Sequence, residues 1–381
     1  MSASRGHGIV HILLIRLRLL GDVVFTTPAI RAIRRRFPDA RLAYLVEPDA
    51  APVVRSNPHL DDVIVSPRRD GIARLTEDLA VAGRLRAARY DAVIDFHGGP
   101  RSSWLCLASG APLRIGYAVA GRRWIYTRAV ARPRELRARH SVRNQWDLLA
   151  ALDESFQQPP DPTADATEMA EEPAAAAAVE ARLRDVGIER THRLIVVHVS
   201  AGNPFRRWPL DGFVDTIAEL ARADERRRFV VTAGPSEGGT SHRVRQLVQE
   251  RLGPGGRHAV AAVDELDLAA LRALIARAWL FIGGDSGPLH VASTTTTPIV
   301  GLYGPTLPAR SAPWRNPDLV SEAIELPDLA CRPCDQRRCE PGDFRCLTHL
   351  APRLVSAAAE RALARAQQPP TLVTPARGRA S

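Results

Sequence analysis

Residues 279–290, WLFIGGDSGPLH, combine residue types that suit phosphate binding. A short apolar run is followed by two glycines, then by an acid at Asp285, a hydroxyl at Ser286 and a histidine at His290. A strand that turns through glycine into a new helix leaves several backbone N–H groups without partners and pointing one way, which favours a phosphate. Ser286 and the amides near Gly287 are therefore candidate phosphate donors. Taken alone, the pattern also fits an ordinary strand-to-helix turn with a capping aspartate.

The beginning of the chain repeats this arrangement. The apolar residues 9–15 are followed by Leu20, Gly21 and Asp22, and then by the TTP sequence at 26–28. Two strand–loop–helix sites of the same kind, one in each half of the chain, predict two α/β domains that face each other.

Length and composition are consistent with two soluble domains. A chain of 381 residues exceeds what one hydrophobic core usually organises. Hydrophobic residues make up 45% and charged residues 25%, as in ordinary globular proteins. The apolar stretch near the N-terminus is interrupted by His11, Arg16 and Arg18, so we expect neither a membrane span nor a signal peptide there.

The charge predicts an anionic partner. The net charge is +10 and the pI is near 10.3. Residues 114–143 contain nine arginines against one acid, Glu135. The chain has no lysine, so all 52 basic residues are arginines, a bias that indicates a GC-rich genome and weakens any argument from a single arginine. No signature of a nucleic-acid-binding module accompanies the cluster, so nucleic acid is not the expected partner.

Strands and helices alternate in both halves, which predicts parallel sheets with helices on both faces. The expected strands include residues 41–46, 63–65, 90–96, 194–198, 229–232, 280–282 and 299–302. Polar motifs follow most of these strands, where open parallel sheets bind ligands. The expected organisation is a flexible start (1–8), a first Rossmann-like domain (9–152), a linker (153–180), a second such domain (181–350), a helix (351–366) and a disordered tail (367–381).

Five motifs, in this order and at these separations, resemble glycosyltransferase family 9, the ADP-heptose:lipopolysaccharide heptosyltransferases. They are LLIRLRLLGDVVFTTPAIRAIRRRFPDA, NPHLDDVIV, YDAVIDFHGGPRSS, HVSAGNPFRRWP and GGDSGPLHVAS. The resemblance extends from Ile9 to about Val355. It implies a GT-B architecture: two Rossmann-like, doubly wound parallel-sheet domains facing across a cleft, with the acceptor bound by the first and the nucleotide sugar by the second.

The family implies inverting transfer, in which a base takes a proton from the acceptor hydroxyl opposite the departing diphosphate. Asp22 matches the aspartate of the family's GDV motif and is the candidate base; the alternative is a cap for the following helix. Arg206 stands where the family usually carries a lysine and is the candidate cation on the leaving diphosphate. There is no DxD metal motif, and the family implies no cofactor for catalysis.

The resemblance also assigns the donor site. Asp285 would contact the heptose hydroxyls, Ser286 and Gly287 the diphosphate, and His290 the phosphates or its own loop. A buried histidine satisfied by a backbone carbonyl is the alternative for His290. The remaining expected donor residues are the small-residue phosphate loop Ser200, Ala201 and Gly202, together with Glu237.

The expected acceptor is the lipid A and Kdo region of lipopolysaccharide, met by a cytoplasmic enzyme at the inner membrane surface. The candidate acceptor-binding residues are Gly21, Arg101, Arg122, Arg123 and Arg128. An arginine-rich face would draw the enzyme to that anionic surface. The alternative is a solvated face without a partner.

Four of the five cysteines lie close together, at Cys331, Cys334, Cys339 and Cys346, whereas Cys106 lies in an apolar helical context. This spacing, without a secretion signal, favours a structural zinc or iron site over disulfides. Reduced cysteines on a surface loop, or a single disulfide, also fit the pattern.

Two other functions stay open. One is a GT-B nucleotide-sugar enzyme with another sugar or another reaction, such as an epimerase, although this leaves GDVVFTTP and the basic cluster unexplained. The other is a noncatalytic protein that binds anionic surfaces, against which the retained Asp22, Asp285 and His290 argue.

Overall fold

The computed structural model describes residues 9–67, 69–133, 138–234, 237–262 and 266–366. The chain divides into two compact units: Met1–Ala170 with Ala309–Asn316, and Glu171–Pro308 with Pro317–Ser381. The division after Ala170 falls inside the expected linker, and nothing in the sequence had indicated the return of Ala309–Asn316 to the first unit. The terminal segments 1–8 and 367–381 lie outside the described residues.

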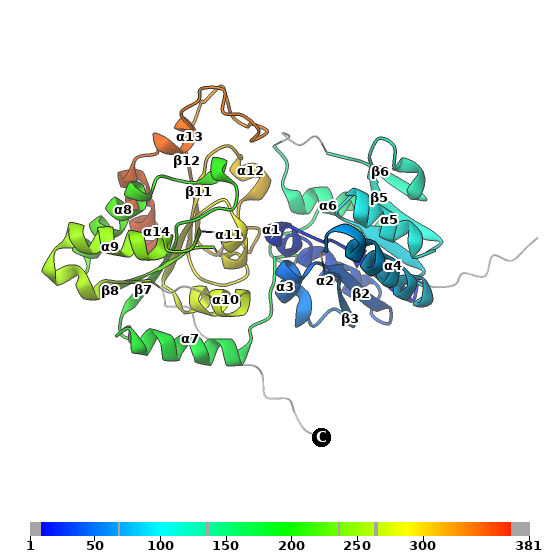
Figure 1. Ribbon diagram of the computed structural model, residues 1–381, viewed down its shortest axis with the longest axis horizontal. Coiled ribbons are helices and arrows are strands. Elements are labelled where there is room, and N and C mark those ends of the chain that lie inside the picture. Colours follow the sequence, from blue (N-terminus) through cyan, green and yellow to red (C-terminus); the bar gives the residue numbers. More distant parts are fainter. Residues whose placement is uncertain (1–8, 68, 134–137, 235–236, 263–265, 367–381) are drawn as a thin grey trace, which may run out of the picture. The chain divides into compact units, whose positions relative to one another are not determined.

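The first unit is built on a six-stranded parallel sheet with the order β3-β2-β1-β4-β5-β6 (Figure 1). Its strands are β1 (His11–Ile15), β2 (Arg41–Val46), β3 (Asp62–Val65), β4 (Ala92–Asp95), β5 (Leu113–Ala118) and β6 (Arg128–Ala131). The central strands are buried almost throughout, as parallel strands covered by helices on both faces must be.

The helices of this unit are short apart from α4. They are α1 (Leu20–Val24), α2 (Thr27–Arg36), α3 (Ala51–Arg55), α4 (Gly71–Ala87), α5 (Pro100–Ala108) and α6 (Ser141–Ala150), with 3-10 turns η1 (Pro48–Ala50), η2 (Arg123–Ile125) and η3 (Glu154–Gln157). Helix α2 is amphipathic, with Ile30 and Ile33 fully buried on one side. Three arginines occupy its last turn, where cations interact favourably with the helix dipole.

The second unit repeats the architecture, with the sheet order β12-β11-β10-β7-β8-β9. Its strands are β7 (Arg193–His198), β8 (Arg227–Thr232), β9 (Val260–Ala262), β10 (Leu280–Gly284), β11 (Ile299–Tyr303) and β12 (Ser321–Glu325). Its helices are α7 (Pro173–Asp185), α8 (Leu210–Ala223), α9 (Thr240–Leu252), α10 (Leu268–Arg277), α11 (Gly287–Ala292), α13 (Arg345–Thr348) and α14 (Pro352–Arg365), with α12 (Pro308–Ser311) at the division and the turns η4 (Pro204–Arg206) and η6 (Pro254–His258). Val355 and Ala358 of α14 pack with Phe213 and Ile217 of α8 in the core of this unit.

The strand order determines where each unit binds a ligand. Counted within each unit, both sheets run 3-2-1-4-5-6, the doubly wound order whose crevice opens between the first and fourth strands. These positions are β1 and β4 in the first unit, and β7 and β10 in the second. The two doubly wound α/β sheets expected from the sequence are thus confirmed. In the described part of the chain, no helix is both long and apolar enough to cross a membrane.

Candidate active site

Asp22 is held at the carboxyl end of β1 by an arginine of the same loop. It is the third residue of α1, directly after the buried Gly21, and its Oδ2 lies 2.5 Å from Nη2 of Arg16. The same oxygen accepts a hydrogen bond from the N–H of Leu19 at 3.3 Å. The Asp22 side chain is 35% exposed, so its carboxylate can cap the helix and still reach a ligand. The cap and base interpretations are therefore compatible.

The loop after β4 meets the Asp22 loop at the first switch point. Arg16 Nη1 donates to the carbonyl oxygen of Phe96 at 2.6 Å. His97 Nδ1 lies 3.1 Å from the carbonyl oxygen of Arg18, so this nitrogen carries a proton and donates it. Burial, and secondarily the charge of Arg16, lower the pKa of His97. A histidine kept neutral near the candidate base was not expected from the sequence, in which His97 is part of a polar stretch that follows an expected strand.

A buried carboxylate shapes the loop that carries His97. Asp95, at the end of β4, is fully buried and accepts hydrogen bonds from the N–H groups of His97 and Gly98 at 2.9 Å. The hydroxyl groups of Tyr126 and Ser102 also donate to it, at 2.7 and 3.0 Å. Gly98 has a φ of +64°, a conformation that favours glycine. Sequence reasoning missed Asp95, although an acid at the end of an apolar strand is a usable signal.

A pocket of about 540 Å³ lies in the first unit beside the Asp22 loop. Loops after β1, β2 and β3 form its wall, with Leu17, Arg18, Leu19, Leu20, Glu47, Pro48, Asp49, Ala50, Pro67 and Arg69. The wall offers two arginines and two carboxylates along with apolar surface. Such a mixture suits a polar ligand that carries both hydroxyl and acidic groups.

Arg101, an expected acceptor residue, supports the wall of this pocket by pairing with one of its residues. Its side chain is 10% exposed and pairs with Glu47 and Asp78 at 2.9 and 2.7 Å. It also donates to the hydroxyl of Ser66 at 2.8 Å. Because these partners use most of its donors, Arg101 positions Glu47 in the pocket wall.

The other three expected acceptor arginines do not line this pocket. Arg122 Nη2 donates to the carbonyl oxygen of Gly98 at 3.1 Å, at the edge of the β4 loop. Arg128 lies on the edge strand β6 and donates to the carbonyl oxygen of Ala151 at 2.6 Å. Arg123 is exposed in η2. The structure therefore separates these arginines from the Asp22 pocket.

At the second switch point, Arg206 and Asp285 meet. Arg206 Nη1 lies 3.2 Å from Asp285 Oδ2 and donates to the Asp285 carbonyl oxygen at 3.2 Å. His290 Nε2 lies 3.6 Å from the other carboxylate oxygen. Asp285 is only 2% exposed, while the Arg206 side chain is 30% exposed. The guanidinium is thus anchored at one end and open to a ligand.

The backbone between β10 and α11 lets other groups approach it closely. Ser286 caps α11 and Gly287 is its first residue. The Ser286 hydroxyl is buried, and within the described residues it has no hydrogen-bond partner. A Cβ on Gly284 would lie 3.3 Å from the carbonyl oxygen of Arg206, so glycine lets the Arg206 loop lie against β10. The Ser286 hydroxyl can therefore donate to a bound anion, and its role at the phosphates stays a prediction.

Ser200 is oriented by a histidine that the sequence analysis did not select. Ser200 Oγ lies 3.0 Å from His198 Nε2 and accepts from the N–H of Gly234 at 2.7 Å. His198 Nδ1 lies 3.0 Å from the hydroxyl of Thr232. Burial lowers the pKa of His198 to about 4, so the ring is neutral. If Thr232 donates to Nδ1, then Nε2 donates to Ser200, whose own proton is left to donate to a ligand.

The remaining expected donor residues occupy the neighbouring loops. Ala201 is buried and its carbonyl oxygen accepts from Arg207 at 2.9 Å, whereas Gly202 is exposed. Arg207 Nε also lies 2.6 Å from Glu237 Oε1. Trp208 is 3% exposed and donates to a carbonyl oxygen of residue 350. Glu237 is therefore brought to the loop after β7 through Arg207.

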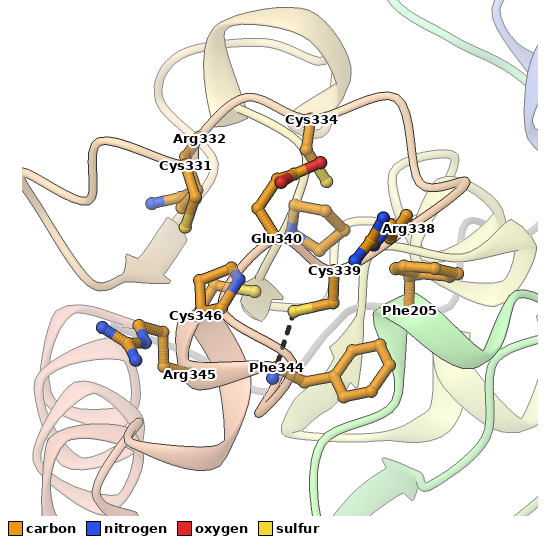
Figure 2. Close-up of a pocket in the computed structure, with 12 residues that line it drawn as sticks. Phe205, Cys331, Arg332, Cys334, Arg338, Cys339, Glu340, Phe344, Arg345 and Cys346 are labelled. Atoms are coloured by element: carbon orange, nitrogen blue, oxygen red, sulfur yellow. Dashed lines mark hydrogen bonds between the residues drawn. The ribbon is translucent and has the colours of Figure 1, made fainter.

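The four clustered cysteines line one small pocket of about 30 Å³ in the second unit (Figure 2). All are free thiols, and burial raises the pKa of Cys346 to about 11. Cys339 Sγ accepts from the N–H of Phe344 at 3.3 Å. Across the residues that the structure describes, no three His, Cys, Asp or Glu side chains are arranged to hold a metal ion. Cys106 lies apart, fully buried in the core of the first unit.

Comparison with known proteins identifies the family of this chain. The model of the family "Glycosyltransferase family 9 (heptosyltransferase)" matches residues 79–342, more than half of the chain. The chain belongs to glycosyltransferase family 9. The match includes the Arg206 loop, Asp285 and most of the cysteine segment.

Relatives extend the similarity over nearly the whole chain. The lipopolysaccharide heptosyltransferase 3 of Escherichia coli is 25% identical over 327 residues, covering 84% of this chain and 91% of its own. The glycosyl transferase family 9 structure from Veillonella parvula has a TM-score of 0.80 at 24% identity and covers 93% of this chain and 98% of its own. The E. coli ADP-heptose lps heptosyltransferase II has a TM-score of 0.73 at 19% identity, covering 94% and 100%. These similarities support the GT-B fold expected for this family 9 member.

Proposed function

We propose that this protein transfers a heptose from ADP-heptose to a sugar of the lipopolysaccharide inner core, with inversion at the anomeric carbon. The observation that carries the proposal is the contact between Arg206 and Asp285, which anchors a partly exposed cation at the ligand-binding edge of the second sheet. The chain's membership of family 9 and its heptosyltransferase relatives support the choice of sugar.

In the proposed reaction, Asp22 takes the proton of the acceptor hydroxyl. The hydroxyl oxygen then forms a bond to the anomeric carbon from the side opposite the diphosphate. The bond from that carbon to the phosphate oxygen breaks, and its electrons leave with ADP. Arg16 keeps the Asp22 carboxylate oriented, and the Nδ1–H group of the nearby His97 is already donated to the carbonyl oxygen of Arg18.

The leaving diphosphate gains negative charge as the bond breaks. Arg206 supplies a fixed positive charge, and the hydroxyls of Ser286 and Ser200 supply hydrogen-bond donors. Donors that are oriented before the reaction stabilise such charge best, because they do not have to reorganise. Asp285 would hold Arg206 in place and accept from the sugar hydroxyls.

The proposed acceptor is a glycolipid of the lipid A and Kdo type. The pocket beside Asp22 supports this choice, because its two arginines, Arg18 and Arg69, can pair with phosphates or carboxylates. The proposal places the protein in the cytoplasm, in peripheral contact with the inner membrane surface.

The decisive experiment incubates the purified protein with ADP-heptose, with and without heptose-deficient lipopolysaccharide. We expect ADP release that depends on the acceptor, and a glycolipid heavier by one heptose. An epimerase would change the nucleotide sugar without any acceptor. A protein that only binds anionic surfaces would leave the ADP-heptose intact.

We also propose that Cys331, Cys334, Cys339 and Cys346 hold a structural zinc or iron ion. Four thiols around one pocket of about 30 Å³ offer a suitable donor set for such an ion. Their side chains would have to turn inward and lose their protons on binding. Elemental analysis of the purified protein tests this: one zinc or iron per chain, lost in Cys334→Ser, supports the site, and metal-free, fully active protein overturns it.

A further inference from the structure

One layer of the first unit carries an unusual amount of exposed apolar surface. Ten large hydrophobic side chains are exposed in the described part of the chain, and half of them belong to α4, α5 and η2. They are Ile72 (83% exposed), Leu75 (60%), Leu79 (54%), Trp104 (37%) and Trp124 (69%). Both of the exposed tryptophans are in this set, which we call the apolar layer.

The three elements share one face of the sheet. Leu85 of α4, Leu105 of α5 and Ile125 of η2 pack in a single core cluster with Leu13 and Ile15 of β1. Helix α5 contacts both α4 and η2. Because their inner sides meet the same sheet face and α5 contacts both neighbours, their outer sides lie next to one another. The apolar layer is therefore a surface feature that spans three neighbouring elements.

Helix α4 carries three of these side chains. Its buried residues lie between Asp78 and Leu85, and residues 71–76 are all exposed. Ile72, Leu75 and Leu79 are spaced three and four residues apart, so they project on one side of the helix. Leu75 and Leu79 lie seven and three residues before the buried Ala82, so they continue its side of the helix beyond the core as exposed apolar surface, and such surface marks a binding site.

Charges around the apolar layer are mainly positive. Five exposed arginines lie on these elements or just before α4, at Arg69, Arg74, Arg84, Arg86 and Arg123. The acids of the same stretch are Asp70, Glu77 and Asp78, and Asp78 is already paired with Arg101. Neither α5 nor η2 contains an acid. Aliphatic and tryptophan side chains bordered by arginines are typical of surfaces that lie in the interface of an anionic bilayer.

The position of the apolar layer fits the proposed substrate. Pro67 and Arg69, which line the pocket beside Asp22, directly precede α4. A glycolipid acceptor in that pocket has its acyl chains in the membrane, so the surface next to the pocket must approach the bilayer. We propose that the apolar layer docks this protein on an anionic lipid bilayer. This inference rests on the proposed transfer to a glycolipid.

Flotation of the full chain with vesicles tests the proposal, using phosphatidylcholine alone or mixed with phosphatidylglycerol. We expect binding to the mixed vesicles that falls at least about tenfold in Ile72→Gln/Leu75→Gln/Leu79→Gln. The matched control is Val186→Gln/Leu354→Gln, which replaces exposed hydrophobic residues of the second unit, 46% and 43% exposed, and should bind like the wild type. Arg84→Gln/Arg123→Gln should weaken binding mainly at low salt.

Tryptophan quenching gives a second readout. Brominated lipids should quench the wild-type fluorescence, and Trp124→Phe should reduce that quenching. Wild-type vesicle binding by the triple glutamine variant overturns the proposal. The proposal is also overturned if the wild type binds no vesicles but forms a dimer, and the triple variant is a monomer. The apolar layer would then join two copies of the chain.

The experiment separates this inference from the proposed function. The triple variant should keep wild-type ADP affinity and wild-type turnover with a delipidated oligosaccharide acceptor, and lose turnover only on vesicle-borne acceptor. Vesicle binding by a protein that never turns over ADP-heptose would support the docking surface and reject the proposed function. Turnover without any layer-dependent vesicle binding would reject the docking surface alone.

Discussion

Gln336, in the middle of the cysteine segment, accepts a hydrogen bond from Arg206 at 2.7 Å between Oε1 and Nε. The same oxygen accepts from Nδ2 of Asn203 at 2.9 Å. Phe205 and Phe344 stack edge to face beside them, with ring centroids 5.2 Å apart. The cysteine segment thus supports the loop that carries the candidate cation.

This contact gives the cysteine segment a positioning role that its sequence did not reveal. Gln336 has a φ of +59°, a conformation that costs a residue with a side chain some free energy and is maintained only by its surroundings. Arg206 is thereby held from two sides, through Nε by Gln336 and through Nη1 by Asp285. A change in the cysteine pocket should reach the donor site along this route.

We expect Gln336→Ala to loosen Arg206 and to raise KM for ADP-heptose several-fold while the thermal melting temperature changes little. The reason is that each hydrogen bond to a charged group contributes roughly 1.5–3 kcal/mol, part of which is used to hold the guanidinium in place. Arg337→Ala is the matched control, because the Arg337 side chain is 84% exposed in the same segment. Equal KM values in both variants would show that Gln336 does not position Arg206.

Arg206 itself should affect both donor binding and departure of the leaving group. Arg206→Ala is expected to weaken ADP binding, measured by calorimetry, and to slow transfer, whereas Arg206→Lys should recover much of both. The lysine keeps the charge but loses the fork that contacts Gln336 and Asp285 together. Unchanged ADP affinity in the alanine variant would assign the cationic role to another residue.

Asp22→Asn separates the base from the helix cap. The amide oxygen can still accept from the N–H of Leu19, so the fold and the ADP affinity should be kept. Turnover should fall by roughly two to four orders of magnitude, the usual contribution of a positioned proton acceptor. Steady-state kinetics and a thermal melt of the same preparation test this. If the variant is well folded and its turnover is near normal, Asp22 only caps the helix and is not the base.

The sequence predicts the strands that form a continuous apolar run and misses those that do not. Strand β2 matches the expected residues 41–46, because five of its six side chains are buried and form a continuous apolar run. Strand β12, SEAIE, has no fully buried residue and lies at the edge of its sheet, so periodicity cannot reveal it. Strands β5 and β6 were also missed, because only three residues of β5 and none of β6 are fully buried.

The residues of the candidate site likewise fall into those that the sequence predicts and those that it does not. Asp22 and Asp285 follow strands in motifs that are readable from local spacing, and the structure brings both to switch points. His198 and Gln336 act through contacts with residues that are distant in sequence, which spacing does not encode. The arginines 122, 123 and 128 were grouped by composition alone, and the structure distributes them over a loop edge, a turn and an edge strand.

His198 should make the second unit sensitive to acid. Its pKa is lowered by burial to about 4, against an ordinary value of 6.5, so between these pH values the unfolded chain binds a proton that the folded chain does not. The stability that neutral His198 contributes is therefore fully present above pH 6.5 and is lost as the pH falls toward 4, by about 3 kcal/mol in all.

In His198→Gln, whose amide can still donate to Ser200, this pH-dependent loss of stability should be missing. The difference in the free energy of unfolding between wild type and variant, measured in urea at several pH values, should shrink on acidification. A difference that is constant from pH 7.5 to pH 4 would mean that His198 is not buried in its neutral form, and the orientation of Ser200 by this ring would fail with it.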